Sequence, residues 1–229
     1  MLGNKKITIK SNIAVRSISG LVIATLFIFG IFFYRPFFYI LLYLISAFML
    51  SEWHDIAKHN TSKLLSNIVG YLLIPLSLSS LMFMSYIDHT GWLLLSFFAI
   101  LWSVDIMAMC GGKLAKGAKL APKLSPNKTI SGLIIGVTSG AIMINLLTLL
   151  PMYQIYLVPF NIKSKIILTI LACIVGITAQ LSDLLISYFK RKAHIKDSGN
   201  IIPGHGGILD RFDSIILTSP LIVLCFKFC

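Results

Sequence analysis

Long, nearly uninterrupted runs of apolar residues are the feature that most constrains this chain. A helix that crosses a bilayer needs about 20 predominantly apolar residues, whereas the core of a soluble protein does not require such runs. We therefore predict an all-α, polytopic integral membrane protein with about seven transmembrane helices. Because the ends of the apolar runs are defined only to within a few residues, the same runs are compatible with six to nine helices. The runs are Ile13–Tyr34, Phe37–Ser51, Ile68–Ile87, Trp92–Met109, Ile130–Leu150, Ile166–Ile186 and Ile215–Phe228, with Met152–Phe160 as a re-entrant or interfacial piece.

The composition excludes an ordinary soluble domain. Hydrophobic residues make up 57% of the 229 residues and charged ones 12%, against about 25% charged residues in soluble domains. A soluble fold this apolar would expose large hydrophobic patches. The four cysteines form no CxxC pair and are expected to pack as small apolar residues rather than to form disulfides or a zinc site. We expect residues 1–229 to form a single membrane-embedded domain.

The basic residues predict the orientation in the membrane. Of the 20 Lys and Arg, the sparse side holds only Arg35, Lys163, Lys165 and Lys227. The other side, which includes the N-terminus, is cytoplasmic by the positive-inside rule. The net charge of +12 is confined to short loops, which suits anionic lipids and nucleotide phosphates and does not indicate a nucleic-acid-binding domain.

The acidic residues gather on the same side, apart from Asp88. Acids at or within a membrane are costly and usually functional, so this face is expected to carry the active site. The residues are Glu52, Asp55, Asp105, Asp183, Asp197, Asp210 and Asp213.

A first candidate catalytic loop spans residues 105–132. Asp105 ends an apolar run, a turn is expected at Gly111-Gly112-Lys113, and Ser125-Pro-Asn-Lys128-Thr129 follows. Glycines let backbone N–H groups approach an anion, and lysines supply positive charge, so the loop is a candidate triphosphate cradle. Lys-rich loops are also ordinary orientation signals, and both interpretations stand.

A second candidate loop spans residues 183–213. Asp183, Ser187, Lys190 and Arg191 have the spacing of one helical face if the helix continues past Ile186. A salt-bridged helix end is the alternative to a metal and phosphate site there. Further on, Asp210 and Asp213 flank Arg211 after a glycine-rich stretch, and such carboxylates suit Mg²⁺. His205 could equally be a hydrogen-bonded loop residue, and Asp213 a helix N-cap.

The second loop resembles the signature of the phosphatidate cytidylyltransferase (CDP-diacylglycerol synthase) family. Residues 187–191, 196–199 and 203–213 read Ser-Tyr-Phe-Lys-Arg, Lys-Asp-Ser-Gly and Pro-Gly-His-Gly-Gly-Ile-Leu-Asp-Arg-Phe-Asp. The stretch 125–129 with Gly132 resembles the family's second motif, and Glu52-Trp53 resembles an early span end. Two family carboxylates are replaced, one by Ile186 and one by Ser131.

This resemblance implies transfer of CMP from CTP to phosphatidate, with Mg²⁺ as cofactor and pyrophosphate as second product. It further implies a multi-pass protein of the inner (plasma) membrane whose active site faces the cytoplasm, with a homodimer as an open expectation. Asp183 and Asp210 are the expected metal ligands, and Lys190, Arg191, His205 and Arg211 further catalytic residues. Substrate binding is expected from Ser125, Lys128, Thr129, Ser187, Lys196, Gly206 and Gly207.

Three other functions are weighed against this one. A CTP-dependent lipid kinase of the dolichol or phytol kinase type shares the substrate, membrane and Mg²⁺ requirements but would transfer a γ-phosphoryl group and release CDP. A CDP-alcohol phosphotransferase is disfavoured because its Asp-Gly-x-x-Ala-Arg pattern is absent. A transporter predicts ionisable groups at mid-bilayer, whereas the acids here gather near one interface.

Overall fold

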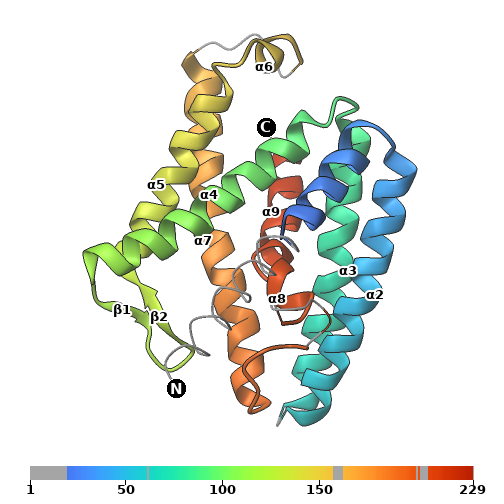
Figure 1. The fold of residues 1–229 in the computed structure, drawn as a ribbon, viewed down its shortest axis with the longest axis vertical. Coiled ribbons are helices and arrows are strands. Elements are labelled where there is room, and N and C mark those ends of the chain that lie inside the picture. The colour runs from blue at the N-terminus through green and yellow to red at the C-terminus, as the bar shows by residue number, and fades with distance from the viewer. Residues whose placement is uncertain (1–19, 61, 157–161, 200, 202–205, 229) are drawn as a thin grey trace, which may run out of the picture.

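The computed structural model describes residues 20–60, 62–156, 162–199, 201 and 206–228 (Figure 1). Within them the chain is a bundle of helices with one small β-hairpin. The elements are a helix Gly20–Phe32, α2 Arg35–His59, α3 Lys63–Ile87, α4 Trp92–Ala115, β1 Lys119–Ala121, β2 Ser125–Thr129, α5 Ile130–Leu147, α6 Pro151–Tyr156, α7 Ile162–Lys192, α8 Leu209–Phe212 and α9 Ile215–Phe228.

The helical, polytopic membrane class is confirmed. Five helices, α2, α3, α4, α5 and the Lys165–Lys192 part of α7, are long and apolar enough to cross a membrane. The last predicted span has the same bounds as α9, Ile215–Phe228, whose 14 residues are few for a membrane span, and the described part of the first is the short apolar helix Gly20–Phe32. The interfacial piece predicted at Met152–Phe160 corresponds to α6 as far as Tyr156, and the rest lies outside the described residues.

Three helices continue well beyond the predicted apolar runs. Helix α2 ends at His59, α4 at Ala115 and α7 at Lys192. Hydropathy marks only the apolar part of a helix, whereas backbone hydrogen bonding continues into the polar turns that follow. These extensions carry polar residues of α2, α4 and α7 to the hairpin end of the bundle, which is the lower end in Figure 1.

The extension of α2 is fixed by its neighbour α3. Trp53 is fully buried, and its indole N–H donates to the Ser66 carbonyl at 2.9 Å. Gly70 makes room for the ring, because a Cβ there would lie 1.7 Å from Trp53 Nε1. Further along α3, the Ser219 hydroxyl of α9 donates to the Ser77 carbonyl at 2.8 Å. Helices α2, α3 and α9 therefore form one packed unit.

Small residues hold α4 and α5 close together. A Cβ at Gly132 would lie 2.6 Å from the Ala108 carbonyl oxygen, and one at Gly136 would lie 2.9 Å from the Val104 carbonyl oxygen. Gly140 continues the same stripe, with its Cβ position 2.9 Å from Val104 Cγ2. Glycines spaced four residues apart let helix backbones approach within a membrane, where packing rather than burial from water drives association.

The turn predicted at Gly111-Gly112-Lys113 is wrong, because all three residues belong to the last turns of α4. The two glycines serve packing. A Cβ at Gly111 would lie 2.6 Å from the Ile135 side chain, and one at Gly112 would lie 2.7 Å from Thr129 Oγ1. Their lack of a side chain brings α4 against α5 and the hairpin instead of opening the backbone to an anion.

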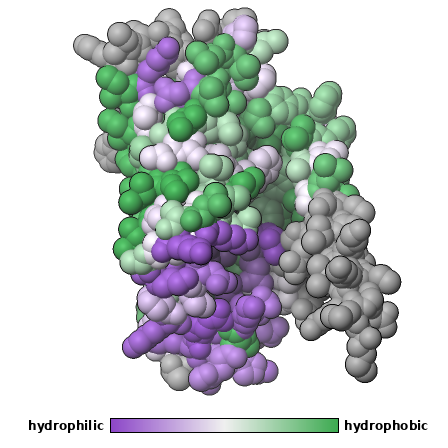
Figure 2. Space-filling model, turned by 60° about the vertical axis from the view of Figure 1, so that its left-hand side comes forward, coloured by the Kyte–Doolittle hydropathy of each residue, from purple (hydrophilic) through white to green (hydrophobic). Residues whose placement is uncertain are grey.

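Polar surface gathers at the hairpin end of the molecule. Figure 2 shows hydrophilic residues over the lower part of this face and a mostly hydrophobic band above them. The ends of α2, α4 and α7 and the β-hairpin lie at this end of the bundle (Figure 1), so segments that are far apart in sequence bring their basic residues to one end. Among the described cysteines, Cys110, Cys173 and Cys225 are free, as expected.

Candidate active site

The β-hairpin supplies one wall of a polar pocket. Strands β1 and β2 pair antiparallel, with Lys119 opposite Thr129 and Ala121 opposite Ser125. The hydroxyl of Thr129 then caps α5 by accepting the Gly132 N–H at 3.1 Å. Capping a helix start in this way commonly stabilises a helix by about 1 kcal/mol. The cap fixes β2 against α5, so that Ser125, Lys128 and Thr129 all line the pocket.

Helix α7 supplies the opposite wall. It runs unbroken to Lys192, so the predicted common face of Asp183, Ser187 and Lys190 is continuous. The Lys128 ammonium lies 2.5 Å from Asp183 Oδ2, which joins the hairpin to α7. Lys128 Nζ is buried and has no hydrogen-bonding partner within the described part of the chain beyond this ion pair. The Ser187 hydroxyl reaches Asp183 Oδ1 at 3.4 Å, which is a weak contact.

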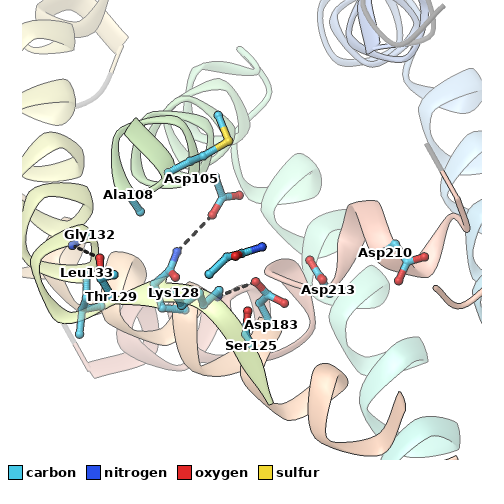
Figure 3. A pocket seen from close by; sticks show the side chains of 13 residues that line it. Asp105, Ala108, Ser125, Lys128, Thr129, Gly132, Leu133, Asp183, Asp210 and Asp213 are labelled. Carbon is cyan, nitrogen blue, oxygen red and sulfur yellow. Dashed lines mark hydrogen bonds and ion pairs between the residues drawn. The ribbon is translucent and has the colours of Figure 1, made fainter. Parts of the chain in front are cut away.

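Together these elements enclose a cavity of about 340 Å³, which we call the polar pocket (Figure 3). Four aspartates from three parts of the chain reach it. Its lining residues are Asp105, Ala108, Met109, Ser125, Asn127, Lys128, Thr129, Gly132, Leu133, Gln180, Asp183, Asp210 and Asp213.

Negative charge is concentrated in the polar pocket. Asp105 accepts a hydrogen bond from Gln180 Nε2 at 3.3 Å. Asp213 lies between Asp183 and Asp210 in Figure 3. Burial, and then the charge of Asp183, raise the pKa of Asp213 well above its ordinary value. The carboxylates therefore repel one another, and a bound cation would relieve that repulsion.

Asp210 has the most complete set of partners of these acids. Its Oδ1 accepts from the buried Lys190 ammonium at 2.6 Å, and its Oδ2 accepts from the Ser198 N–H at 2.8 Å and the Gly207 N–H at 3.1 Å. Burial alone would raise its pKa, but the hydrogen bond and charge of Lys190, with the two backbone N–H groups, hold that pKa below its ordinary value. Asp210 thus stays ionised at the pocket edge.

Glu52 lies beneath the same loop, outside the polar pocket. It is 4% exposed and accepts three hydrogen bonds, from the Ser198 hydroxyl at 2.7 Å, the Ile208 N–H at 2.9 Å and the Leu209 N–H at 2.8 Å. The contact joins α2 to residues about 150 positions later and fixes the start of α8, which carries Asp210.

The predicted site residues divide into two groups. Five of them line the polar pocket: Asp183, Asp210, Ser125, Lys128 and Thr129. Three others are placed behind or beside it. Lys190 is held by Asp210, Arg191 donates from Nε to the Leu124 carbonyl at 3.3 Å, and Ser187 contacts Asp183 from behind.

The glycine-rich loop carries the remaining predictions. Gly206 has a positive φ of 83°, and Gly207 packs so closely on Glu52 that a Cβ would lie 2.5 Å from Glu52 Oε2. Both glycines let the loop pack closely around Glu52 and Asp210, and neither lines the polar pocket. Lys196 is exposed, and Arg211 lines a second cavity described below. His205 lies outside the described residues.

Two polar pocket residues were not foreseen, Asn127 and Gln180. Gln180 lies three residues before Asp183, so a polar side chain inside an apolar run on the same helical face was the available signal. Asn127 was seen only as part of a motif. The stripe of Gly132, Gly136 and Gly140 was also visible as small residues at every fourth position.

The polar pocket fits a Mg²⁺ ion whose ligands come partly from the protein and partly from the substrate. Among the described residues, no three Asp, Glu, His or Cys side chains are grouped so as to hold a metal on their own. Mg²⁺ typically takes one or two carboxylates together with substrate phosphates and waters. Asp183 and Asp210 suit that pattern, with Asp213 between them, although ligation through Asp210 Oδ1 requires Lys190 to move aside.

Comparison with known proteins gives a consistent result. The sequence profile of the Cytidylyltransferase family matches residues 59–229. A phosphatidate cytidylyltransferase of Rickettsia bellii is 49% identical over 213 residues, which cover 93% of this chain and 90% of that protein. The protein of the same name from Rickettsia conorii is 51% identical over 215 residues, covering 94% and 91%. One from Staphylococcus aureus strain COL is 44% identical over 125 residues, covering 55% and 45%.

Proposed function

The chain belongs to the phosphatidate cytidylyltransferase family and is a CTP:phosphatidate cytidylyltransferase of phospholipid synthesis, and we propose that its reaction takes place in the polar pocket. The observation that carries the proposal is the meeting of Lys128 and Asp183 across that pocket. Lys128 comes from the hairpin stretch that resembles the family's second motif, and Asp183 comes from α7, four residues before Ser187, where the stretch that resembles the family signature begins.

The reaction needs positioning and charge stabilisation more than a protein nucleophile. An oxygen of the phosphatidate phosphate attacks the α-phosphorus of CTP, a new phosphorus–oxygen bond forms, and the bond to the β-phosphate breaks as pyrophosphate leaves. Both reactants are anions, so the protein gains most by holding them in line and compensating their charge. When bound, Mg²⁺ supplies part of that compensation.

The chain's own residues divide this work in our proposal. Lys128 donates to the CTP phosphates once they displace it from Asp183, since its ammonium has no other partner among the described residues. Ser125 and Thr129 line the same wall and complete the nucleotide contacts. Asp183 and Asp210 hold Mg²⁺, and Asp213 supports them from between.

The residues behind the pocket position those that line it. Lys190 orients Asp210, Arg191 joins α7 to the hairpin through Leu124, and Ser187 orients Asp183. Gly206 and Gly207 allow the loop to pack closely against Asp210 and Glu52. We keep Lys196, Arg211 and His205 as phosphate-binding or catalytic candidates from the family resemblance.

We further propose one domain that lies in the inner membrane with the polar pocket open to the cytoplasm. Lys113 at the end of α4 and Lys119 and Lys128 in the hairpin bring basic charge to the hairpin end, which is also the hydrophilic end in Figure 2, and this supports the orientation by the positive-inside rule. A homodimer is proposed as the assembly, and cross-linking in native membranes followed by mass measurement tests it.

An assay of the purified protein with phosphatidate, Mg²⁺ and CTP labelled at the α-phosphate tests the function. We expect label in the lipid and an equal amount of pyrophosphate. A parallel reaction with CTP labelled at the γ-phosphate separates the alternatives, since a lipid kinase would transfer that label to lipid and release CDP. Absence of α-label in the lipid, from protein shown to be folded, would overturn the proposal.

A further inference from the structure

A second cavity opens beside the polar pocket and has the opposite character. It measures about 360 Å³, and we call it the apolar cavity. Three separate parts of the chain form it, namely the helix Gly20–Phe32, helix α4 and the segment from α8 into α9. Its lining residues are Gly20, Ile23, Ala24, Phe27, Phe98, Leu101, Trp102, Asp105, Arg211, Phe212, Ser214 and Ile215.

Aromatic rings give the apolar cavity a fixed shape. Phe27 meets Phe98 edge to face with ring centroids 5.4 Å apart, and it meets Phe212 at 5.8 Å. Phe98 in turn stacks on Trp102 at 5.9 Å. Interlocked rings of this kind hold one another in place beyond what burial alone would do. These four residues come from three elements, namely the helix Gly20–Phe32, α4 and α8, so the cavity wall is part of the packed core.

Few charged side chains line the apolar cavity. Asp105 and Arg211 are its only ionisable lining residues within the described chain. Asp105 also lines the polar pocket, so the two cavities share this residue. Trp102 and Asp105 are three residues apart on α4, and such neighbours share a helical face. The apolar wall therefore passes directly into the acidic site.

We propose that the apolar cavity receives the diacylglycerol part of phosphatidate and delivers its phosphate to the polar pocket past Asp105 and Arg211. This inference rests on the proposed function, and it assigns each substrate its own entrance. A nucleotide base could stack on these rings, but its polar edge, the ribose hydroxyls and the triphosphate would lack hydrogen-bonding partners along these apolar walls. A lipid places acyl chains there and needs a cation only for its phosphate, which Arg211 provides.

The apolar cavity orients the lipid more than it attracts it. Acyl chains leave one apolar surrounding, the bilayer, for another, so their transfer yields little free energy. The benefit is alignment of the lipid phosphate with the α-phosphorus of CTP. Filling the cavity should therefore impair use of long-chain phosphatidate without changing CTP binding.

Ala24→Trp fills the apolar cavity from a half-buried position. Ala141→Trp is the matched control, because Ala141 is also half-buried and lines a different apolar groove, beside Ile142 and Leu149. With dioleoyl phosphatidate in mixed micelles, we expect Ala24→Trp to lower kcat/KM about tenfold or more, whereas Ala141→Trp stays within about twofold. The KM for CTP should stay within about twofold in both variants. Equal losses in the two variants, or a raised KM for CTP in Ala24→Trp, would overturn the inference.

A labelling experiment tests the cavity without turnover. Phosphatidate with a photoactivatable diazirine in one acyl chain is irradiated with the full-length protein, and labelled peptides are mapped. We expect label on the peptide that contains Phe98 and Trp102, and its loss in Ala24→Trp. Label that maps elsewhere, or persists in that variant, contradicts the lipid entrance. If labelling is as expected but the wild-type protein makes no CDP-diacylglycerol, the proposed function fails and the lipid site stands.

Discussion

Two carboxylates at the hairpin end of this bundle, the buried Glu52 and the half-buried Asp183, have opposite surroundings. Glu52 accepts hydrogen bonds from Ser198, Ile208 and Leu209 within 2.9 Å, and it lies outside both cavities. Asp183 lies in the polar pocket, where it has a weak contact from Ser187 at 3.4 Å and an ion pair with Lys128. Both acids are part of the resemblance to the family, yet their surroundings differ.

The difference separates a structural acid from a functional one. A carboxylate whose acceptor sites are filled by the protein is stabilised in place and has little capacity left for a ligand. One that is opposed by other acids, and whose paired cation has no other partner among the described residues, is set up to exchange that cation for substrate and metal. Asp210 combines the two situations. Both of its oxygens accept hydrogen bonds from the protein, and it also lines the polar pocket.

The largest effect is expected from Asp183→Asn. Loss of the charge should lower kcat/KM about 10³-fold, or about 4 kcal/mol, as expected when a preorganised charged group is removed from an active site. The melting temperature in detergent should change little, because the lost ion pair with Lys128 is offset by weaker repulsion between the remaining acids of the pocket. Asp55→Asn, at an exposed acid on α2, is the matched control and should keep full activity. Full activity of folded Asp183→Asn would remove Asp183 from the mechanism.

The Lys190–Asp210 pair should give the next largest effect, and on stability. Lys190→Met leaves the ionised Asp210 without its ammonium in a buried setting, which costs about 3 kcal/mol in the free energy of unfolding. The double variant Lys190→Met/Asp210→Asn removes the unpaired charge and should regain part of that loss while staying inactive. Thermal unfolding in detergent measures both. No recovery in the double variant would show that the pair is not the source of the loss.

Glu52→Gln should be milder and should affect the fold before the chemistry. An amide keeps one acceptor oxygen, so at least one of the three donors loses its partner, at a cost of about 2 kcal/mol. Hydrogen exchange at the Ile208 and Leu209 amides should speed up, while amides in α3 keep their protection. If those two amides exchange as in the wild type, Glu52 does not hold the loop.

Ser187→Ala should have the smallest effect. Its contact with Asp183 is long at 3.4 Å, so its loss should lower kcat/KM no more than about threefold. The assay of Asp183→Asn serves here without change. A loss as large as that of Asp183→Asn would mean that Ser187 contacts substrate directly, and it would move this residue from the positioning group to the catalytic one.

The periodicity of apolar and polar residues was enough to predict much of the fold and part of the site. Apolar runs placed the helices, and helical spacing placed Asp183, Ser187 and Lys190 on one face of α7. Local patterns succeed here because helices satisfy their hydrogen bonds within one segment, as a bilayer requires. The same patterns said nothing about how far α2 and α4 continue beyond their apolar parts.

The contacts between distant segments that form the site could not be predicted from local sequence patterns. The hairpin of β1 and β2 is short, charged and interrupted by Pro126, so it leaves no strand pattern in the sequence. Glu52 meets Ser198 across 146 positions of the chain, and no local period reports a contact of that range. Gly111 and Gly112 suggested a turn, because glycine favours turns and close helix packing alike, and only the neighbour decides between them.

Binding of Mn²⁺, as a spectroscopic substitute for Mg²⁺, tests the contrast between the two acids most directly. Electron paramagnetic resonance counts bound Mn²⁺ in the wild type, Asp183→Asn and Glu52→Gln, each with a non-hydrolysable CTP analogue and below its melting temperature. We predict that Asp183→Asn weakens Mn²⁺ binding at least about tenfold, whereas Glu52→Gln stays within about threefold of the wild type. Wild-type binding in Asp183→Asn together with its loss in Glu52→Gln would contradict the assignment of the polar pocket as the metal and nucleotide site.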